Sequence, residues 1–284
     1  MKNTKTLLIP ALLILLSTAC EGEKEEFNAC RCTPLLKSTS HSDAPILNFY
    51  ETYKSKEMGQ FFNSILMDSI HFQLDSILYE ENDYPSNHEF AEIFRINIDD
   101  DYRFVESPEL GFALTQDTSR INEMLSFYLE ENWFEVDKVK FAWSKNKKSF
   151  LDDGGTYNTL YALKLDAGDK ARFSSEGIQS AIKYKDSRDN EISINVSMNE
   201  EGTQKWSLMT IENVGNYIAI VSRGKVLSAP IINGPITGGE TRISGDFTEN
   251  ESQELVDLIN CEAHKREIGQ AAFLKEVADC SKKK

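Results

Sequence analysis

The sequence predicts an α+β fold, a sandwich in which helices pack on a mainly antiparallel sheet, preceded by a smaller mixed domain. Between residues 160 and 260, strand-like and helix-like segments follow one another without the strict alternation of a doubly wound fold. The pair Arg223-Gly224 separates two apolar runs, which is typical of a hairpin with a tight turn. Thr248 and Glu251 form a capping-box pattern ahead of apolar residues at helical spacing, namely Leu255, Leu258 and Ile259.

The smaller domain is expected to span residues 46 to 150 and to contain both helix and strand. A helical pattern begins at Ile46, with Leu47, Tyr50 and Tyr53 on one short face. Residues 90 to 105 suggest the end of a helix that runs into a strand. A second helix is predicted from Asp117-Thr118, and a strand or strand pair is predicted from residues 133 to 141. One face of that second helix carries Ile121, Met124, Leu125, Tyr128 and Leu129.

The second domain is expected to span residues 151 to 261, entered through a polar loop at residues 144 to 157. The predicted order is a strand at 160 to 165, a helix at 175 to 184, a strand at 192 to 198 and a helix at 200 to 213. Three short strands and the capped helix follow. Residues 262 to 284 are predicted to form a C-terminal helix and a basic tail, with Ile268, Ala271, Ala272 and Val277 at helical spacing.

The first 19 residues have the pattern of an export signal. Two lysines precede an apolar run at residues 7 to 16, which is too short to span a bilayer, and small residues then lead to Cys20. This end resembles a bacterial lipoprotein cleavage box, which would leave Cys20 lipidated as the first residue of a tether at residues 20 to 45. Ser17 stands where such boxes usually carry an aliphatic residue, so ordinary cleavage after Ala19 is the alternative.

The acidic composition of the mature chain makes nucleic acid an improbable partner, and the export signal with its lipoprotein-like end implies the bacterial cell envelope. Removing residues 1 to 19 takes away two lysines and no acids, so the net charge falls from −15 to −17. Residues 21 to 26 (EGEKEE) are expected to be a solvated part of the tether. They also resemble the surface-export signal of some Bacteroidetes lipoproteins. The expected location is therefore periplasmic and lipid-anchored, with the outer-membrane surface as the alternative.

Cysteine usage indicates an oxidising compartment. With Cys20 lipidated, Cys30, Cys32, Cys261 and Cys280 remain, an even number that allows three pairings. A bridge between Cys30 and Cys32 would close a small strained ring, so each is expected to pair with one of the two C-terminal cysteines. The alternatives are free thiols or a soft-metal site with His41, which lacks the second Cys/His pair of a closed site.

No catalytic constellation, metal site or cofactor is expected. Asp99, Asp100 and Asp101 form one acidic cluster and Asp152-Asp153 another, but neither has the alternating oxygen ligands and distal Glu of a calcium loop. The four histidines, His41, His71, His88 and His264, are scattered and form no metalloprotease pair. A metal-dependent hydrolase that uses the aspartate clusters is the weakest of the functional alternatives.

One ordered series of residues resembles a known family. The hairpin, Ser228-Ala229-Pro230, Gly238-Gly239, Ile243-Ser244-Gly245 and Phe247-Thr248 follow one another as in the head subdomain of the first periplasmic domain of SecD and SecDF. The resemblance covers residues 158 to 260, with fainter likeness at 106 to 157. This family assists the bacterial protein-export channel through proton-coupled membrane helices, and no apolar run of this chain reaches the length of such a helix.

The resemblance implies a non-enzymatic, membrane-anchored module that assists translocation. It would contact an unfolded exported polypeptide or dock on the Sec machinery, either SecDF or the channel, through strand edges and apolar grooves. The candidate polypeptide-binding residues lie at the hairpin and its exits: Arg223, Lys225, Ser228, Pro230, Asn233 and Arg242. The alternative function is an envelope or surface lipoprotein for ligand binding or adhesion that is unrelated to export.

Overall fold

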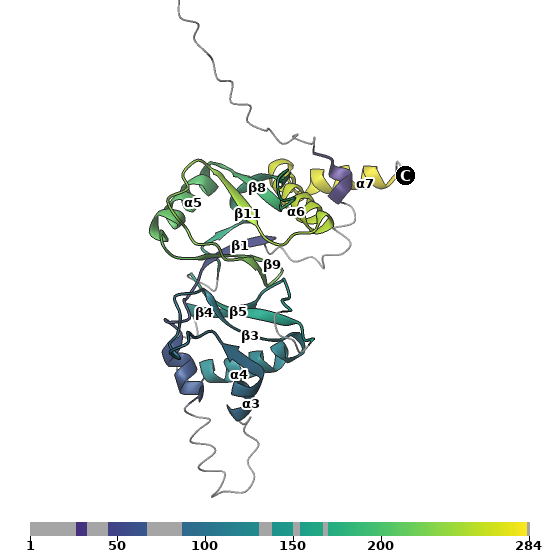
Figure 1. Ribbon diagram of the computed structural model, residues 1–284. Helices are drawn as coiled ribbons and strands as arrows, with labels where there is room; N and C mark the ends of the chain where they lie inside the picture. Colours follow the sequence, from purple (N-terminus) through teal and green to yellow (C-terminus); the bar gives the residue numbers. More distant parts are fainter. Residues whose placement is uncertain are drawn as a thin grey trace, which may run out of the picture.

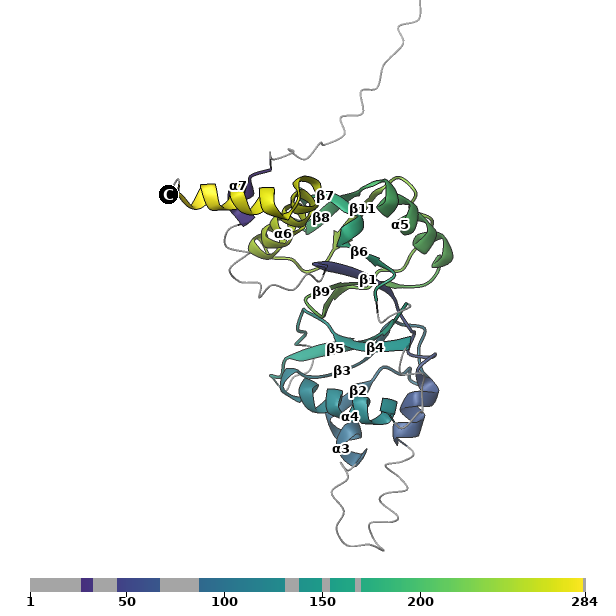
Figure 2. The same cartoon turned by 180° about the vertical axis from the view of Figure 1, so that it is seen from behind.

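The computed structural model describes residues 27–32, 45–66, 87–130, 138–149, 154–166 and 170–282. The elements form a stack of layers (Figures 1 and 2), with helices at each end and β-sheets between them. We call the part with α3 and α4 the base, and the part with α5 and α6 the head. No helix in the described ranges is long and apolar enough to cross a membrane.

The base is one four-stranded antiparallel sheet covered on its outer face by helices. The strand order is β2 (Phe94–Ile96), β3 (Glu109–Leu114), β5 (Tyr157–Lys164) and β4 (Val139–Trp143). Helices α3 (Asn87–Ile93) and α4 (Thr118–Glu130) and the helical residues 59–66 pack on this sheet, and the 3-10 turn η2 (Thr115–Asp117) leads into α4. Their shared core is rich in aromatic rings, among them Phe61, Phe62, Phe90, Phe94 and Trp143.

The head contains two sheets that enclose a second core. One has the order β10 (Lys225–Ser228), β9 (Ile218–Ser222), β1 (Leu47–Glu51) and β6 (Phe173–Ser174). The other has the order β11 (Glu240–Ser244), β8 (Ile192–Met198) and β7 (Ile178–Lys185), with the 3-10 turn η4 (Ser175–Gly177) before β7. Helices α5 (Glu200–Glu212) and α6 (Glu249–Ile268) also contribute side chains to this core.

Head and base join through the stacked faces of two sheets. In β9, Ile218 and Ile220 face the head core, whereas Ala219 and Val221 face the base. In β5, Tyr161 and Leu163 meet them from the opposite side. These strands are buried on both faces because they lie between two sheets, so their sequences are apolar without the alternation of a half-exposed strand.

Several predicted elements are confirmed. Helix α4 buries the predicted face, from Ile121 to Leu129. Helix α6 begins with a complete capping box, in which the Thr248 side chain accepts from the Glu251 N–H and the Glu251 carboxylate accepts from the Thr248 N–H. Arg223 and Gly224 both have positive φ angles, 49° and 75°, as a type I′ hairpin turn requires.

Two predicted helices are wrong. Residues 175 to 184 form η4 and β7, because a β-bulge between Ile178 and Ser180 lets Ile178 and Ala181 face the same core, a spacing that imitates a helix. Leu47 and Tyr50 lie on opposite faces of strand β1, which pairs with β6 and β9 from distant parts of the sequence.

The sheets do not follow the expected boundary between residues 150 and 151. Strand β1, from the expected smaller domain, lies in a head sheet, whereas β5, the expected first strand of the head, lies at the centre of the base sheet. The stretch expected to enter the head instead connects β4 to β5, and Lys148 pairs with Tyr157 there. The chain therefore crosses between head and base more than once.

A two-disulfide clamp holds the N-terminal segment against the C-terminal helices. Cys30 pairs with Cys280, and Cys32 pairs with Cys261. The clamp includes the 3-10 turn η1 (Ala29–Arg31), the end of α6 and helix α7 (Gln270–Lys282). Gly269, with φ of 84°, separates the two helices, so α7 buries Phe273 and Val277 and leaves Ala271 and Ala272 exposed, contrary to the predicted face.

Candidate functional site

Strand β11 is an open edge of the three-stranded head sheet, β11-β8-β7. It pairs only with β8, and the described part of the chain places no strand beyond it. The Met198 N–H donates to the Gly239 carbonyl at 2.8 Å, which fixes the alternation of paired and outward residues along the strand. The N–H and C=O groups of Glu240, Arg242 and Ser244 therefore point away from β8. These groups form a template for a further strand.

The edge at β7 is covered, and the edge at β10 in the other head sheet is partly occupied. The side-chain amide of Asn260 on α6 donates to the Ala181 carbonyl at 2.9 Å and accepts from the Ala181 N–H at 2.8 Å. Arg266 donates to the Ile178 carbonyl farther along β7. At β10, the Lys145 N–H donates to the Val226 carbonyl at 2.7 Å. The hairpin edge that the sequence pointed to is thus partly occupied by the chain itself.

An apolar groove opens beside β11, between the two head sheets. Its volume is about 270 Å³, and its floor is formed by Trp206, Ile218 and Ile220. The rim comes from residues 230–234, Ile236 and the β11 residues Thr241 and Arg242. Trp206 is 3% exposed, and none of the described residues accepts a hydrogen bond from its Nε1. The floor of the groove is therefore an aromatic and aliphatic surface, and the Trp206 Nε1 is buried.

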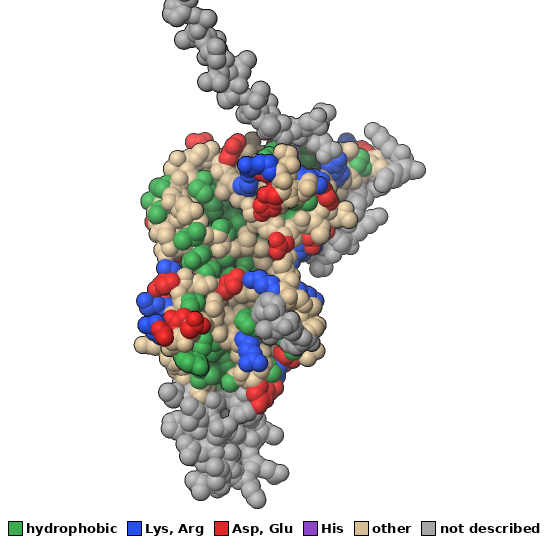
Figure 3. All heavy atoms as spheres, in the orientation of Figure 1, with side chains coloured by type: hydrophobic (Ala, Val, Ile, Leu, Met, Phe, Trp, Pro, Cys, Tyr) green, Lys and Arg blue, Asp and Glu red, His purple; other side chains and the backbone are tan. Residues whose placement is uncertain are grey.

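Exposed apolar side chains surround this side of the head. Leu208, Ile211 and Val214 follow the outer side of α5 and its exit, and each is about half exposed. Ile231 is 44% exposed and lies next to them, because Val214 bridges to Ile232. Figure 3 shows hydrophobic side chains gathered on the side of the head that carries α5. A patch of this kind marks an interaction surface more often than isolated exposed apolar residues do.

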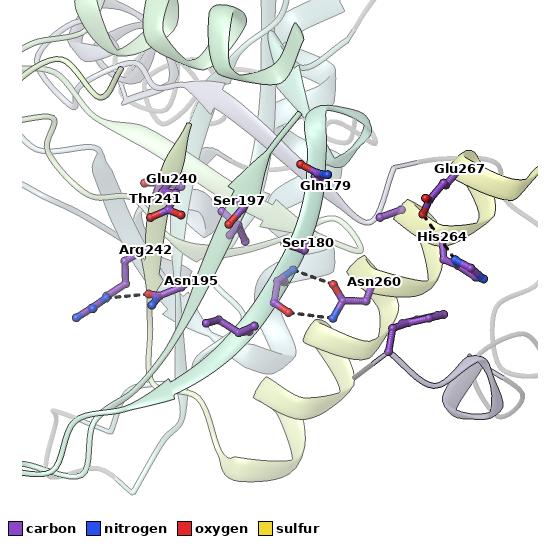
Figure 4. Close-up of a pocket in the computed structure, with 15 residues that line it drawn as sticks. Gln179, Ser180, Asn195, Ser197, Glu240, Thr241, Arg242, Asn260, His264 and Glu267 are labelled. Atoms are coloured by element: carbon purple, nitrogen blue, oxygen red, sulfur yellow. Dashed lines mark hydrogen bonds and ion pairs between the residues drawn. The ribbon is translucent and has the colours of Figure 1, made fainter. Parts of the chain in front are cut away.

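The outer face of the same sheet is polar. A shallow hollow of about 610 Å³ lies over β7, β8 and β11 and is bordered by α6 (Figure 4). Asn195 accepts from Arg242 Nε at 3.0 Å, and the Arg242 guanidinium stacks over the Tyr184 ring. Gln179, Ser180 and Ser197 line the same hollow. The β11 edge therefore separates an apolar groove on one side from a polar face on the other.

The structure brings together three of the six candidate polypeptide-binding residues. Pro230, Asn233 and Arg242 line the apolar groove. Arg223 lies at the hairpin turn, where it pairs with Glu254 on α6 at 2.9 Å, and the exposed Lys225 follows that turn. The Ser228 hydroxyl is buried next to a bulge in β10, and no described group bonds with it.

Sequence reasoning missed Trp206 and the exposed apolar residues of α5. Residues 206 to 214 carry apolar side chains on both sides of the helix, because Met209 faces the core while Leu208 and Ile211 face outward. In the sequence, apolar residues outside the one helix face that is expected to be buried could have indicated an exposed apolar surface. The groove could not be predicted from the sequence, because its walls come from α5, β9, β11 and residues 230–236.

Other candidate residues do not assemble into a site. The Asp99 carboxylate accepts from the backbone N–H groups of Asp101 and Arg103, and Arg103 also pairs with the carboxylates of Asp99 and Asp101. Over the described residues, no group of three or more His, Cys, Asp or Glu side chains could hold a metal ion. Cys20, His41, His71 and the Asp152-Asp153 pair lie outside the described ranges.

Comparison with known proteins identifies the part of the chain that carries this site. Residues 157–263 match the family described as "SecDF, P1 head subdomain". The chain is 33% identical over 128 residues to the protein translocase subunit SecD of Sebaldella termitidis, a match that covers 44% of this chain and 31% of that protein. It is 46% identical over 66 residues to SecD of Rickettsia bellii, covering 23% and 13% of the two chains.

The matched regions span less than a third of those two relatives. A solved structure titled "Structure and function of a membrane component SecDF that enhances protein export" matches with 16% identity and a TM-score of 0.31. That alignment covers 75% of this chain and 92% of the other.

Proposed function

We propose, from the SecD/SecDF head-like domain that residues 157–263 form, that this chain is an envelope lipoprotein that binds extended segments of exported polypeptides and so assists translocation. Cys20 would carry the lipid, and the Sec machinery would be the assembly that it serves. The observation that carries the proposal is the open edge of β11 beside an apolar groove. The role is binding, without a chemical reaction.

Main-chain pairing at β11 gives a general export factor the low sequence preference that it needs. An extended polypeptide would bond to the outward N–H and C=O groups of Glu240, Arg242 and Ser244. Its successive side chains would point to opposite faces of the extended sheet. One set would enter the apolar groove, and the other would lie along the polar face. Chains with alternating apolar and polar residues would therefore bind best.

Apolar contact gives the groove a second means of recognition, since Trp206, Ile218 and Ile220 form its floor. Leu208, Ile211 and Ile231 would extend the apolar contact beyond the groove. An unfolded chain exposes apolar side chains and unpaired main-chain N–H and C=O groups, whereas a folded chain buries or pairs most of them. This difference supports selection of unfolded substrates.

The edge can be tested with two substitutions at one position. Proline at position 242 removes the outward N–H and leaves the pairing with β8 intact, because the residue-242 N–H does not point to β8. Alanine removes the same side-chain contacts with Asn195 and Tyr184 but keeps the N–H. A permanently unfolded, carboxymethylated protein is the probe, and its binding is measured by fluorescence anisotropy. We expect Arg242→Pro to weaken binding at least tenfold and Arg242→Ala much less.

Equal binding by Arg242→Pro and Arg242→Ala, with both variants folded by circular dichroism, would exclude strand addition at β11. The cellular role is tested separately with a photo-crosslinker at Asn233, on the groove rim. Capture of exported chains, SecDF or the channel supports the export function. If only outer-membrane or extracellular proteins are captured and export is unaffected, the chain is a surface ligand-binding lipoprotein, and protease treatment of intact cells would then digest it.

A further inference from the structure

The disulfide clamp decides where the N-terminal tether meets the folded protein. Cys30 and Cys32 are covalently bound to α7 and α6, at the end of the head that is farthest from the base helices α3 and α4 (Figures 1 and 2). Without the clamp, the first residue held by a sheet would be Leu47 in β1. The two bridges therefore shorten the free tether and fix it to one pole of the molecule.

Chain length then limits how far this pole can lie from a membrane. Cys20 and Cys30 are ten residues apart, and an extended chain spans at most about 3.5 Å per residue, so the reach is about 35 Å. We propose that the clamp end of the head, formed by η1, the end of α6 and α7, faces the lipid surface that holds Cys20, while the base points away from it. This inference rests on the lipidated Cys20 of the proposed function.

The clamp end carries exposed apolar side chains and charges of both signs. Leu274 on α7 is 47% exposed, and Phe27 next to the clamp is 40% exposed. Lys275 on α7 is exposed, and so are the acidic Glu267 and Asp279, whereas Arg266 is held by the Ile178 carbonyl and by Glu262. Glu276, the acidic neighbour of Lys275, is hydrogen-bonded to His264 Nε2 at 2.9 Å.

The helices of the base end are more acidic than the clamp end. Its helices α3 and α4 expose acidic side chains, among them Glu92 and Glu130. Arg120 on α4 is held between Glu89 and Glu123. An anionic leaflet would repel this end, so electrostatics and tether length favour the same orientation. The head, with the β11 edge, would then work close to the membrane, and the base would reach outward.

Two matched labels can measure the orientation. Ala91 on α3 and Ala272 on α7 are both exposed helical alanines, one at each end of the molecule. Each is changed to Cys in the full lipoprotein and labelled, after mass spectrometry has verified the lipid and both native disulfides. The protein is placed in vesicles of phosphatidylethanolamine and phosphatidylglycerol that contain a surface energy acceptor. We expect several-fold greater energy transfer from Ala272→Cys than from Ala91→Cys.

A flexible Gly/Ser insertion between Glu26 and Phe27 is the control, since it lengthens the tether without changing a described residue. It should lower the transfer from the Ala272→Cys label. Equal or greater transfer from Ala91→Cys, on a lipidated protein, would overturn the orientation and leave the polypeptide-binding function standing. An unmodified Cys20 would overturn the lipid anchor and the orientation together. Loss of polypeptide binding in Arg242→Pro would leave both the lipid anchor and the orientation unchanged.

Discussion

Hydrogen bonds between single polar groups join three elements of the head. The Glu262 carboxylate on α6 accepts from the Ser175 hydroxyl at 2.7 Å, and that hydroxyl in turn accepts from the Leu47 N–H at 3.3 Å. This chain of bonds joins α6, η4 and β1. Burial raises the pKa of the Glu262 carboxyl above its usual value of 4.5, although the Ser175 hydrogen bond and the charge of Arg266 act against the shift.

The raised pKa of Glu262 predicts how stability depends on pH. Because the folded pKa lies above the unfolded one, the native state holds the proton more tightly, and the resulting stabilisation is complete below pH 4.5. It is lost as pH rises through the folded pKa. Glu262→Gln cannot titrate but can still accept from Ser175. Urea unfolding across this pH range should therefore show wild type losing stability relative to Glu262→Gln as pH rises; parallel curves would contradict the shifted pKa.

Gly202 lies at a close approach between α5 and the backbone of η4. A Cβ at this position would lie 2.0 Å from the carbonyl oxygen of Gly177. Gly202→Ala should therefore destabilise the protein by about 1 to 3 kcal/mol, although alanine is the better helix former. Urea unfolding measures the difference. Gly234→Ala is the control, since no atom lies within 4 Å of its Cβ, and a similar loss in both variants would refute the packing argument.

At the scale of elements, α6 organises the head. Its capping box fixes where the helix begins, Asn260 and Arg266 cover the β7 edge, and Cys261 joins it to the clamp. With the β7 edge covered in this way, β11 is the edge of that sheet that remains open. The position of one helix therefore determines which strand can accept another chain.

The start of α6 gives a prediction at this scale. Thr248→Ala removes the side-chain oxygen that accepts from the Glu251 N–H and should lower the free energy of unfolding by about 1 kcal/mol. Thr248→Ser keeps that oxygen and should stay close to wild type. Thermal and urea unfolding of both variants make the comparison. If Thr248→Ser lost as much as Thr248→Ala, the methyl group rather than the cap would be the stabilising part.

At the scale of the whole molecule, two kinds of long-range connection hold the layers together. The chain enters the head at β1, forms the base from β2 to β5 and returns to the head at β6, so the head is not continuous in sequence. The disulfides join residues 250 and 229 positions apart. With either bridge removed, the other still closes the long loop, and only the short loop of about 23 residues between the two bridges is freed.

Both single removals should therefore lose the same loop entropy, about 3 kcal/mol in the chain-entropy model. Their packing differs, because Cys32 and Cys261 are buried with Phe273 and Val277, whereas Cys30 is exposed. The double variant Cys32→Ser/Cys261→Ser should thus be less stable than Cys30→Ser/Cys280→Ser. Urea unfolding under non-reducing conditions makes the comparison. Equal stability of the two would mean that burial of the inner bridge adds nothing.

The sequence by itself determined the features that depend on neighbouring residues. The α5 boundaries, the start of α6 with its capping box, the Arg223-Gly224 turn and the buried face of α4 were all predicted, because caps, turns and helical faces are set within a few residues. The end of α6 was not, since the helix continues to Ile268 beyond the break expected at residue 262. The order of motifs also indicated the head-like domain that the family comparison shows.

Only the tertiary structure decided which strands pair and where the site opens. Strand β1 had a helix-like apolar pattern, and its pairing with β9 depends on a segment far away in the sequence. In β7, a bulge gave the apolar residues a helix-like spacing. The groove needed α5, β9 and β11 to meet, and the open edge needed α6 to cover β7. Contacts between distant segments leave no fixed spacing in a sequence, so the site became visible only after the chain was folded.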